Sequence, residues 1–210
     1  MQGINTIFYV IVLIMSVVVH EVSHGFAADA QGDPTARFAG RLSLNPLRHI
    51  DIVGSVVLPL LLIIFNAGFI IGWAKPVPYN ERNLRNKKYG TMIVAGAGIL
   101  ANIGLALIFG IAIRFAPLLG SAAPAFVLIA TAITLVNLLL ALFNLIPIPP
   151  LDGSKILFSL LPARMNRVRA TVEYLSLPLL IVFIVFLWPL IAPFVGYLFS
   201  FITGQPIALT

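Results

Sequence analysis

Long runs of apolar residues, separated by short polar and charged stretches, set the pattern of this chain. Runs of about 20 residues or more are long enough to cross the hydrocarbon core of a bilayer as helices. The runs lie at about residues 4–28, 52–73, 89–115, 124–148 and 175–202. This pattern predicts an all-α polytopic membrane protein with about four to six transmembrane helices. We expect a single membrane-embedded domain over residues 1–210.

The composition supports this prediction and excludes other classes of protein. Hydrophobic residues make up 60% of the chain and charged residues 10%, and the mean hydropathy of +1.06 is far above that of soluble domains. The absence of cysteine excludes disulfides and thiolate metal sites. The net charge of +6 comes from Lys and Arg in short loops, where these residues report membrane orientation. We therefore expect a lipid bilayer, and no nucleic acid, as a partner.

The first apolar run contains the polar segment His20-Glu21-Val22-Ser23-His24. On a helix, His20 and His24 lie one turn apart on the same face, so both imidazoles can bind one metal ion. Glu21 projects beside them and can take a proton from a metal-bound water. Ionisable side chains are costly in apolar surroundings unless something binds them. A zinc ion is the simplest ligand that would do so.

A second polar segment follows the fourth run and ends in Leu151-Asp152-Gly153. Three prolines between Asn144 and Asp152 are expected to end or unwind the helix near the membrane surface. Asp152 would complete a His-His-carboxylate set with a fourth position open for water. An Asp here can instead cap a short helix beginning at Gly153, and capping does not exclude ligation. Asn144, two turns back, can donate to a carbonyl or its oxyanion.

Loop charges predict the orientation of the chain in the membrane. The stretches 75–88 and 152–173 are rich in Lys and Arg and are expected in the cytoplasm, whereas 116–123 carries no charge. His20 lies near the far end of the first run, and Asp152 lies just past the far end of the fourth. A metal shared by these residues would therefore lie near the cytoplasmic face, with the N-terminus outside.

The run 52–73 is then expected not to cross the membrane. The chain from residue 28 to residue 75 would begin and end on the cytoplasmic side, and about 22 apolar residues cannot cross twice. We therefore predict a re-entrant or short β-hairpin element between the first and third apolar runs. Its prolines and glycines agree, because irregular backbone survives at membrane depth where protein covers it. Hydropathy alone would predict a span.

These motifs together resemble the site-2 protease family of intramembrane zinc metalloproteases, peptidase family M50. The resemblance rests on His20 to His24 and on Asn144 to Gly153. Gly98-Ile99-Leu100-Ala101-Asn102 is similar to the family's G-P-x-x-N signature, with Ile99 in place of the usual proline. Two further segments are similar to a compact subgroup of short bacterial and archaeal members without PDZ or CBS domains: Arg41-Leu42-Ser43-Leu44-Asn45-Pro46 and Gly72-Trp73-Ala74-Lys75-Pro76-Val77-Pro78.

The resemblance implies a zinc metalloendopeptidase that cuts transmembrane protein substrates within or near their membrane segments, in regulated intramembrane proteolysis. It implies one Zn²⁺ per chain held by His20, His24 and Asp152, with Glu21 as general base and Asn144 beside the substrate carbonyl. It also implies the cell membrane of a bacterium or archaeon, with the active site toward the cytoplasm. A regulatory membrane partner is compatible with this class and is not identified by the sequence.

A substrate helix must unwind before cleavage, and its extended segment can then pair with an exposed strand edge. Residues 72–77 or 41–44 are the candidates for such an edge. We therefore expect the substrate to contact Gly72, Trp73, Lys75 and Pro76, together with Asn102. Asn102 can equally well bond between packed helices, which is the usual role of an Asn in a membrane.

A membrane metal-ion transporter or metal-binding protein is the alternative from another class, because buried His and Asp can line a permeation path. It predicts ligands spread along the membrane, whereas this chain has one cluster near one face with Glu21 beside it. A catalytically inactive scaffold is a third alternative, and the intact His-Glu-His-Asp set argues against it. His49 and Glu173 are rival ligands, but their charged loops favour solvated or phosphate-facing roles.

Overall fold

The computed structural model describes residues 2–57, 60–61, 64–65 and 74–206. These residues form helices and irregular segments, without a strand in the described part of the chain. Among the described residues, four helical segments are long and apolar enough to cross a membrane: Ile7–Ala30, Gly90–Arg114, Ala116–Leu145 and Ser176–Thr203. The prediction of an all-α polytopic membrane protein is confirmed, with four such segments at the lower end of the predicted range.

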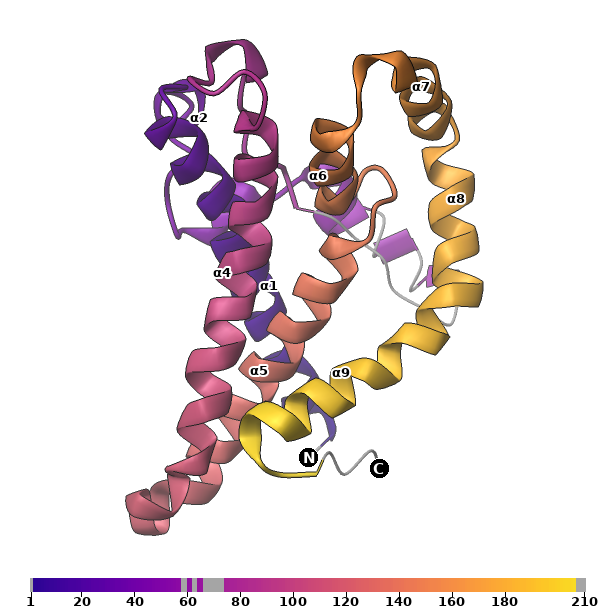
Figure 1. Cartoon of the computed structure of the whole chain (residues 1–210). Coiled ribbons are helices and arrows are strands. Elements are labelled where there is room, and N and C mark those ends of the chain that lie inside the picture. The colour runs from indigo at the N-terminus through magenta and orange to yellow at the C-terminus, as the bar shows by residue number, and fades with distance from the viewer. Residues whose placement is uncertain (1, 58–59, 62–63, 66–73, 207–210) are drawn as a thin grey trace.

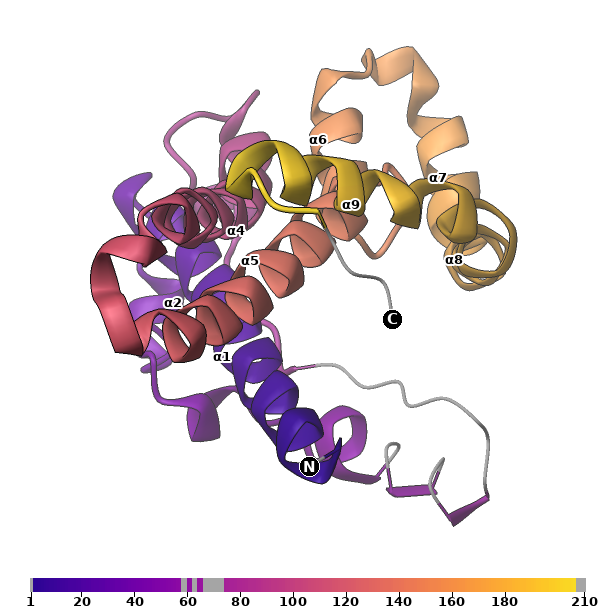
Figure 2. The ribbon, with the colours of Figure 1, turned by 90° about the horizontal axis from the view of Figure 1, so that it is seen from below.

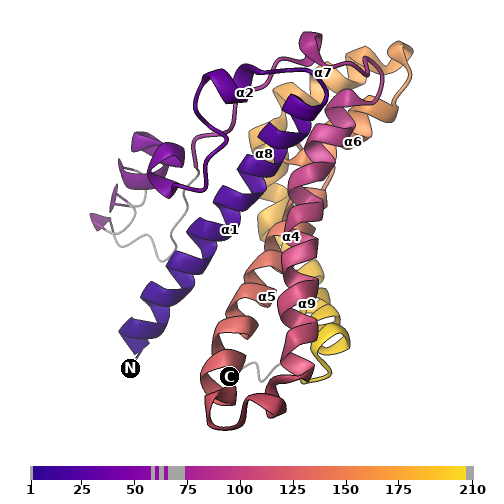
Figure 3. The same ribbon diagram turned by 90° about the vertical axis from the view of Figure 1, so that its left-hand side faces the viewer.

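The long helices form an antiparallel bundle (Figure 1). Helices α1 (Gln2–Ala30) and α5 (Ala123–Leu145) run in one direction, and α4 (Gly90–Arg114) runs in the other. Helix α1 begins, and the described C-terminal helical segment ends, at the lower end of the bundle (Figures 1 and 3). Helix α4 is central, because it packs against α1 and α5 and also contacts α6 and α9.

The main apolar core joins α4 and α5 to α9. Small side chains allow the helices to approach closely, as is usual in membrane bundles. The buried members of this core are Ala106, Ile113, Ala130, Leu138, Val195 and Phe199. In the most apolar window of Ser176–Thr203, only 11% of the residues are buried inside the protein. An outward apolar surface of this kind is suited to lipid, because it would aggregate in water.

The last apolar run is one continuous helical segment with a bend. It consists of α8 (Ser176–Val182), the π-helical turn η6 (Phe183–Leu187) and α9 (Trp188–Thr203). Pro189 lies in the first turn of α9 and cannot donate a backbone hydrogen bond to the preceding turn of this continuous segment. A π-helical turn followed by proline bends the axis. Seen from below, α9 lies across α4 and α5 (Figure 2).

Two long connections join α1 to α4 and α5 to the last apolar run, and much of their described part lies toward the end of the bundle where α1 ends and α4 begins (Figure 1). The first holds α2 (Thr35–Phe38), η1 (Pro46–His49), η2 (Ile52–Val57) and η3 (Glu81–Asn83). The second holds α6 (Asp152–Leu160), η5 (Ala163–Met165) and α7 (Asn166–Tyr174). At the opposite end, η4 (Ala116–Ala122) joins α4 to α5. Most of the predicted re-entrant element, including residues 66–73, lies outside the described residues.

Asp33 anchors the first connection. Its carboxylate is fully buried and accepts hydrogen bonds from the backbone and hydroxyl of Thr35, from Asn80 N (2.6 Å) and from Asn83 Nδ2 (2.9 Å). Burial by itself would raise the pKa of the Asp33 carboxyl, but these hydrogen bonds outweigh it and hold the pKa below its ordinary value. The ionised form of Asp33 therefore links the end of α1 to the residues that precede α4.

We expect Asp33→Asn to lower Tm by about 3–10 °C at neutral pH, because the amide cannot accept all four hydrogen bonds. A lowered folded pKa stabilises the protein above the unfolded pKa of about 4. That contribution is lost as the pH falls through the lower pKa of the folded state. Thermal melts in detergent between pH 7 and pH 3 should show the two proteins converging as the pH falls. The exposed neighbour variant Glu81→Gln is the control, and equal Tm values at neutral pH for Asp33→Asn and the parent would contradict the anchoring role.

Candidate metal centre

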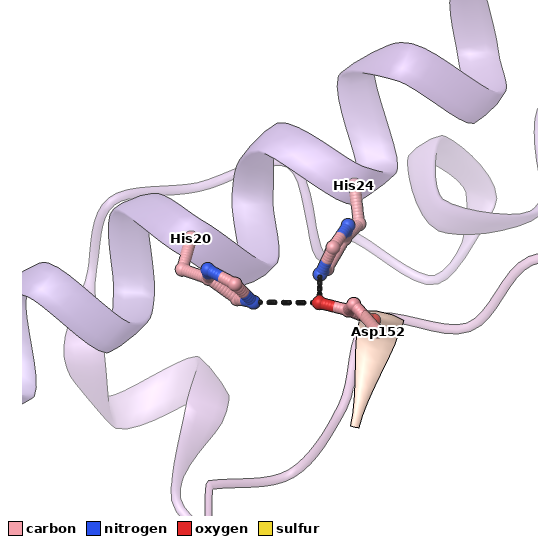
Figure 4. A group of neighbouring side chains, drawn as sticks. All are labelled: His20, His24 and Asp152. Atoms are coloured by element: carbon pink, nitrogen blue, oxygen red, sulfur yellow. Dashed lines mark hydrogen bonds and ion pairs between the residues drawn. The ribbon is translucent and has the colours of Figure 1, made fainter. Parts of the chain in front are cut away.

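Two histidines one helical turn apart meet an aspartate that is far from them in the sequence (Figure 4). His20 and His24 come from α1, and Asp152 is the first residue of α6. The Nε2 atoms of both histidines lie 3.0 Å from Asp152 Oδ2, and one ligand atom from each residue lies within 4.8 Å of the others. All three residues are at most 7% exposed. The structure therefore brings together the three ligands that the sequence predicts.

The donor set fits a zinc ion. Two imidazole nitrogens and one carboxylate oxygen converge, and three protein ligands with one open position are typical of catalytic zinc sites. The imidazole rings of His20 and His24 are nearly perpendicular, at 87°, so their Nε2 atoms approach from different directions. Lys155 Nζ donates to the other carboxylate oxygen, Asp152 Oδ1, at 2.9 Å. This contact turns Oδ2 toward the histidines.

Each histidine is held from behind through its other ring nitrogen. His20 Nδ1 lies 2.5 Å from Asn102 Oδ1, and His24 Nδ1 lies 2.7 Å from the backbone carbonyl of Val94. Both partners belong to α4. Metal-binding histidines commonly donate from the second ring nitrogen, which fixes the ring orientation and leaves the first nitrogen for the metal. The contacts with α4 thus hold both imidazoles in a fixed orientation.

Glu21 faces the segment that follows residue 73. Its Oε2 accepts a hydrogen bond from the backbone N–H of Val77 at 2.9 Å. The side chain of Val77 is buried, whereas Lys75 and Pro76 beside it are exposed. The predicted base therefore lies against residues 74–77, one of the two segments in which we expected a substrate-binding edge.

The other predicted site residues have varied positions. Asn144 lies one residue before the end of α5 and donates from Nδ2 to the carbonyl of Leu140 in its own helix (3.0 Å). Its contact with a substrate carbonyl stays a prediction. The sequence predicts that Asn102 contacts the substrate. Asn102 is instead fully buried behind His20, a position from which it can orient the histidine. Gly72 and Trp73 lie outside the described residues.

The alternatives for the ligand set lie elsewhere. His49 is buried in η1, where its Nε2 donates to the carbonyl of Ser43 at 2.8 Å. Glu173 is on α7 and pairs with Arg169 at 2.9 Å. Among the described residues, the metal-capable cluster consists of His20, His24 and Asp152. Leu151, not Asp152, occupies the N-cap position of α6, and Asp152 lies in the first turn of that helix, so the capping alternative does not account for its position.

Comparison with known proteins decides the family. The chain is 34% identical over 195 residues to the protein named "Putative zinc metalloprotease YwhC" of Bacillus subtilis, covering 90% of this chain and 83% of that protein. The chain belongs to peptidase family M50. The model of that family matches residues 119–187. A second relative, named "Putative zinc metalloprotease Rip2" in Mycolicibacterium smegmatis, is 33% identical over 144 residues, which are 67% of this chain and 52% of that protein. No solved structure matches the chain.

Membership of a peptidase family and four segments suited to cross a bilayer identify an intramembrane metalloprotease. The comparisons give no support to the transporter alternative. They also agree with the resemblance that the motifs carry, because the similarity to the Bacillus subtilis protein covers 90% of this chain. The positions of the individual side chains then explain what each part of the M50 pattern contributes.

Gly98 of the M50 pattern lets α4 approach the two histidines. A Cβ at this position would lie 2.5 Å from His24 Cε1 and 2.7 Å from His20 Cε1. Such distances are far inside normal carbon contacts of about 3.5–4.0 Å. Asn102 follows Gly98 by one helical turn and therefore reaches His20 from the same face. The sequence shows Gly98 only as the first residue of the segment that ends at Asn102, and the structure gives it two specific neighbours, the imidazoles of His20 and His24.

Gly153 has a similar function on the other side of the metal centre. Its Cβ would lie 2.2 Å from the carbonyl oxygen of Leu145 and 2.5 Å from that of Ile146. Both of these atoms are backbone atoms that cannot rotate away. Only glycine therefore allows the chain to fold back against the end of α5 and place Asp152 beside α1. The sequence shows Gly153 only as the last residue of the segment Leu151-Asp152-Gly153.

We expect Gly98→Ala to weaken zinc binding by about tenfold or more, because the added methyl overlaps both imidazole rings. Gly96→Ala is a matched control on the same helix, since a Cβ there meets nothing within 4 Å. Zinc affinity can be measured for both purified proteins in detergent, by competition with a chelator of known affinity. Equal affinities for the two variants would show that the close approach at Gly98 is not needed for the metal.

Proposed function

We propose that His20, His24 and Asp152 hold one Zn²⁺ per chain and that Glu21 is the general base for hydrolysis of peptide bonds in or near transmembrane segments. The observation that carries this proposal is the convergence of the two histidine Nε2 atoms with one carboxylate oxygen of Asp152. Glu21 lies on α1, the helix that carries both histidines. The printed names of the two relatives, both zinc metalloproteases, support the choice of metal. The H-E-x-x-H segment supplies two of the ligands and the base.

When bound, zinc supplies Lewis acidity, which acidifies a water and polarises the scissile carbonyl. Glu21 accepts a proton from the attacking water as the water oxygen bonds to the carbonyl carbon. Glu21 then passes that proton to the amide nitrogen as the C–N bond breaks, so the carboxylate is restored. The hydrogen bond from Val77 N holds the Glu21 side chain in one direction. Asn144 is proposed to donate to the developing oxyanion.

Residues 74–77 support a binding mode for an extended substrate. Lys75 and Pro76 are exposed, and the next residue donates its backbone N–H to the proposed base. A substrate strand that adds to this segment would therefore pass Glu21. Gly72 and Trp73 are proposed to extend the same edge. The substrate is then a membrane protein with a locally unwound helix, and a regulatory partner in the membrane stays a prediction.

The distribution of basic residues supports an active site toward the cytoplasmic side of a bacterial or archaeal cell membrane. Of the 13 Lys and Arg residues, twelve fall in the connections 31–89 and 146–175, and the remaining one is Arg114 at the end of α4. Helix α2 of the first connection and helices α6 and α7 of the second lie toward the end of the bundle that holds the metal centre (Figure 1). Cytoplasmic loops are enriched in Lys and Arg. This orientation places the N-terminal end of α1 outside.

The ends of the apolar stretch 52–73 support a re-entrant or hairpin path for it. Lys75 N donates to the carbonyl of His49 at 2.8 Å, so the residues just before and just after the stretch lie side by side. A single span would instead carry residue 75 to the other side of the bilayer, about 30 Å away. We therefore propose that this stretch enters the membrane and leaves on the same side.

We expect Glu21→Gln to retain the metal and to lose nearly all peptide hydrolysis, because the substitution keeps the shape and removes the proton acceptor. We expect Asp152→Ala to lose the metal itself, since two imidazoles alone hold zinc weakly. Elemental analysis and cleavage of a single-span membrane substrate in detergent, with and without chelator, measure both effects. Activity of Glu21→Gln within severalfold of the parent would contradict the mechanism. Full zinc in Asp152→Ala would remove that residue from the ligand set.

Single cysteines can test the proposed path, because the chain has no cysteine of its own. The exposed positions Leu47 and Lys88 flank the stretch, and exposed Leu118 lies at the other end of the bundle. An impermeant thiol reagent should label Leu47→Cys and Lys88→Cys from the cytoplasmic side of oriented vesicles and Leu118→Cys from the outer side. Labelling of positions 47 and 88 from opposite sides would make 52–73 a true span.

A further inference from the structure

A chain of buried hydrogen bonds runs from His20 across α4 to α5. Asn102 Oδ1 faces His20 Nδ1, and Asn102 Nδ2 donates to Asn137 Oδ1 at 2.7 Å. Asn137 Nδ2 in turn donates to the backbone carbonyl of Ile133 at 2.8 Å and to Ser16 Oγ on α1 at 2.9 Å. Asn102 and Asn137 are fully buried, and Ser16 is 4% exposed. Neither the H-E-x-x-H segment nor the Asp-Gly segment includes Asn137 or Ser16.

The direction of this chain follows from one atom that can only accept. The carbonyl oxygen of Ile133 has no hydrogen to give, so Asn137 must present its NH₂ group there and its Oδ1 to Asn102. Asn102 must then present its NH₂ group to Asn137, because two amide oxygens face to face would repel. Its own Oδ1 is left for His20, so the proton must lie on His20 Nδ1. The lone pair of His20 Nε2 consequently points toward Asp152 and His24.

We infer that Asn137 is a positioning residue for metal binding, which acts through Asn102 to hold His20 with its proton on Nδ1 and its Nε2 free for the metal. This inference rests on the proposed metal site and adds to it a residue on a third helix. His24 needs no such relay, because the Val94 carbonyl that it faces can only accept. His20 faces the side-chain amide of Asn102, which could present either its oxygen or its NH₂ group. The hydrogen bond to Asn137 fixes the orientation in which the oxygen faces His20.

The bilayer interior strongly favours one orientation of the buried Asn102 amide. A buried amide that turned the wrong way would leave unpaired polar atoms in surroundings without water to satisfy them. Asn137 is fully buried in the bundle. It lies seven residues before Asn144 on α5, which is about two turns deeper in the membrane than the end of that helix. A residue that only joined helices would stabilise the bundle without affecting zinc. A positioning residue predicts a change in metal affinity.

Three variants at buried positions of α5 test the inference. Asn137→Leu keeps the volume approximately and removes both the donor and the acceptor. Asn137→Asp keeps an acceptor toward Asn102 whether it is ionised or protonated, so it should rescue the relay. Thr134→Val is the matched control, since Thr134 is equally buried on the same helix and its hydroxyl bonds only within it, to the carbonyl of Ala130 (2.7 Å). Asn137→Ser, which keeps a polar group without a fixed direction, replaces Asn137→Leu if that protein does not fold.

The first measurement is zinc affinity of the purified proteins in detergent, by chelator competition. We expect Asn137→Leu to bind zinc about tenfold more weakly, as is typical when a group behind a metal-binding histidine is lost. Asn137→Asp and Thr134→Val should remain within about threefold of the parent, well inside that effect. The second measurement is hydrogen exchange of the His20 Nδ1–H in zinc-loaded protein labelled with ¹⁵N-histidine. This proton should exchange slowly in the parent and in Asn137→Asp, and faster in Asn137→Leu.

Parent-like zinc affinity in Asn137→Leu would overturn the inference and leave Asn137 as a residue that joins helices. Equal weakening in Asn137→Leu and Asn137→Asp would overturn it as well, because the direction of the relay would then not matter. Failure of the proposed metal site is recognised separately, by full retention of zinc in His20→Ala. That result would remove the basis of the inference without reference to Asn137.

Discussion

The close approach of α4 to α1 at Gly98 is the contact on which the rest of the metal centre depends. It places the imidazoles of His20 and His24 against a helix surface without a side chain, and it brings Asn102 and the Val94 carbonyl within reach of their Nδ1 atoms. Packing alone would be satisfied by alanine, as it is at many positions of this bundle. The polar requirement of the histidines makes the position more demanding, because a displaced imidazole would leave two buried partners unpaired.

The same requirement explains why the polar groups of the bundle form connected sets. Apolar surroundings provide no water, so each buried donor must meet an acceptor from the protein. Asp152 meets both histidines and Lys155, and Asn102 meets His20 and Asn137. Gly153 allows Asp152 to reach this set from the end of α5. The helices are therefore held in register by polar contacts near the site and by small apolar side chains farther from it.

The clustering of His20, His24 and Asp152 could be predicted from the sequence, because the pattern that indicates it is short and specific. The spacing of His20 and His24 places them on one helix face, and the requirement that Asp152 share their depth relates the first run to the fourth. The neighbours of these residues are less predictable. Nothing in the sequence says that Gly98 faces an imidazole, or that Asn102 lies behind His20 and away from the substrate. Asn137 was not singled out at all, since a lone Asn in an apolar helix gives no indication of its partner.

Charge explains why this cluster is suited to a divalent cation. Among the described side chains of the centre, the two acidic groups Asp152 and Glu21 lie near the one ammonium of Lys155, so acidic groups are in excess. A bound Zn²⁺ ion would reverse that excess and would leave a net positive charge at the centre. That charge would favour a developing oxyanion on a substrate carbonyl, more strongly in low-dielectric surroundings. Lys155 contributes to this balance without occupying a ligand position, because it pairs with the carboxylate oxygen that faces away from the histidines.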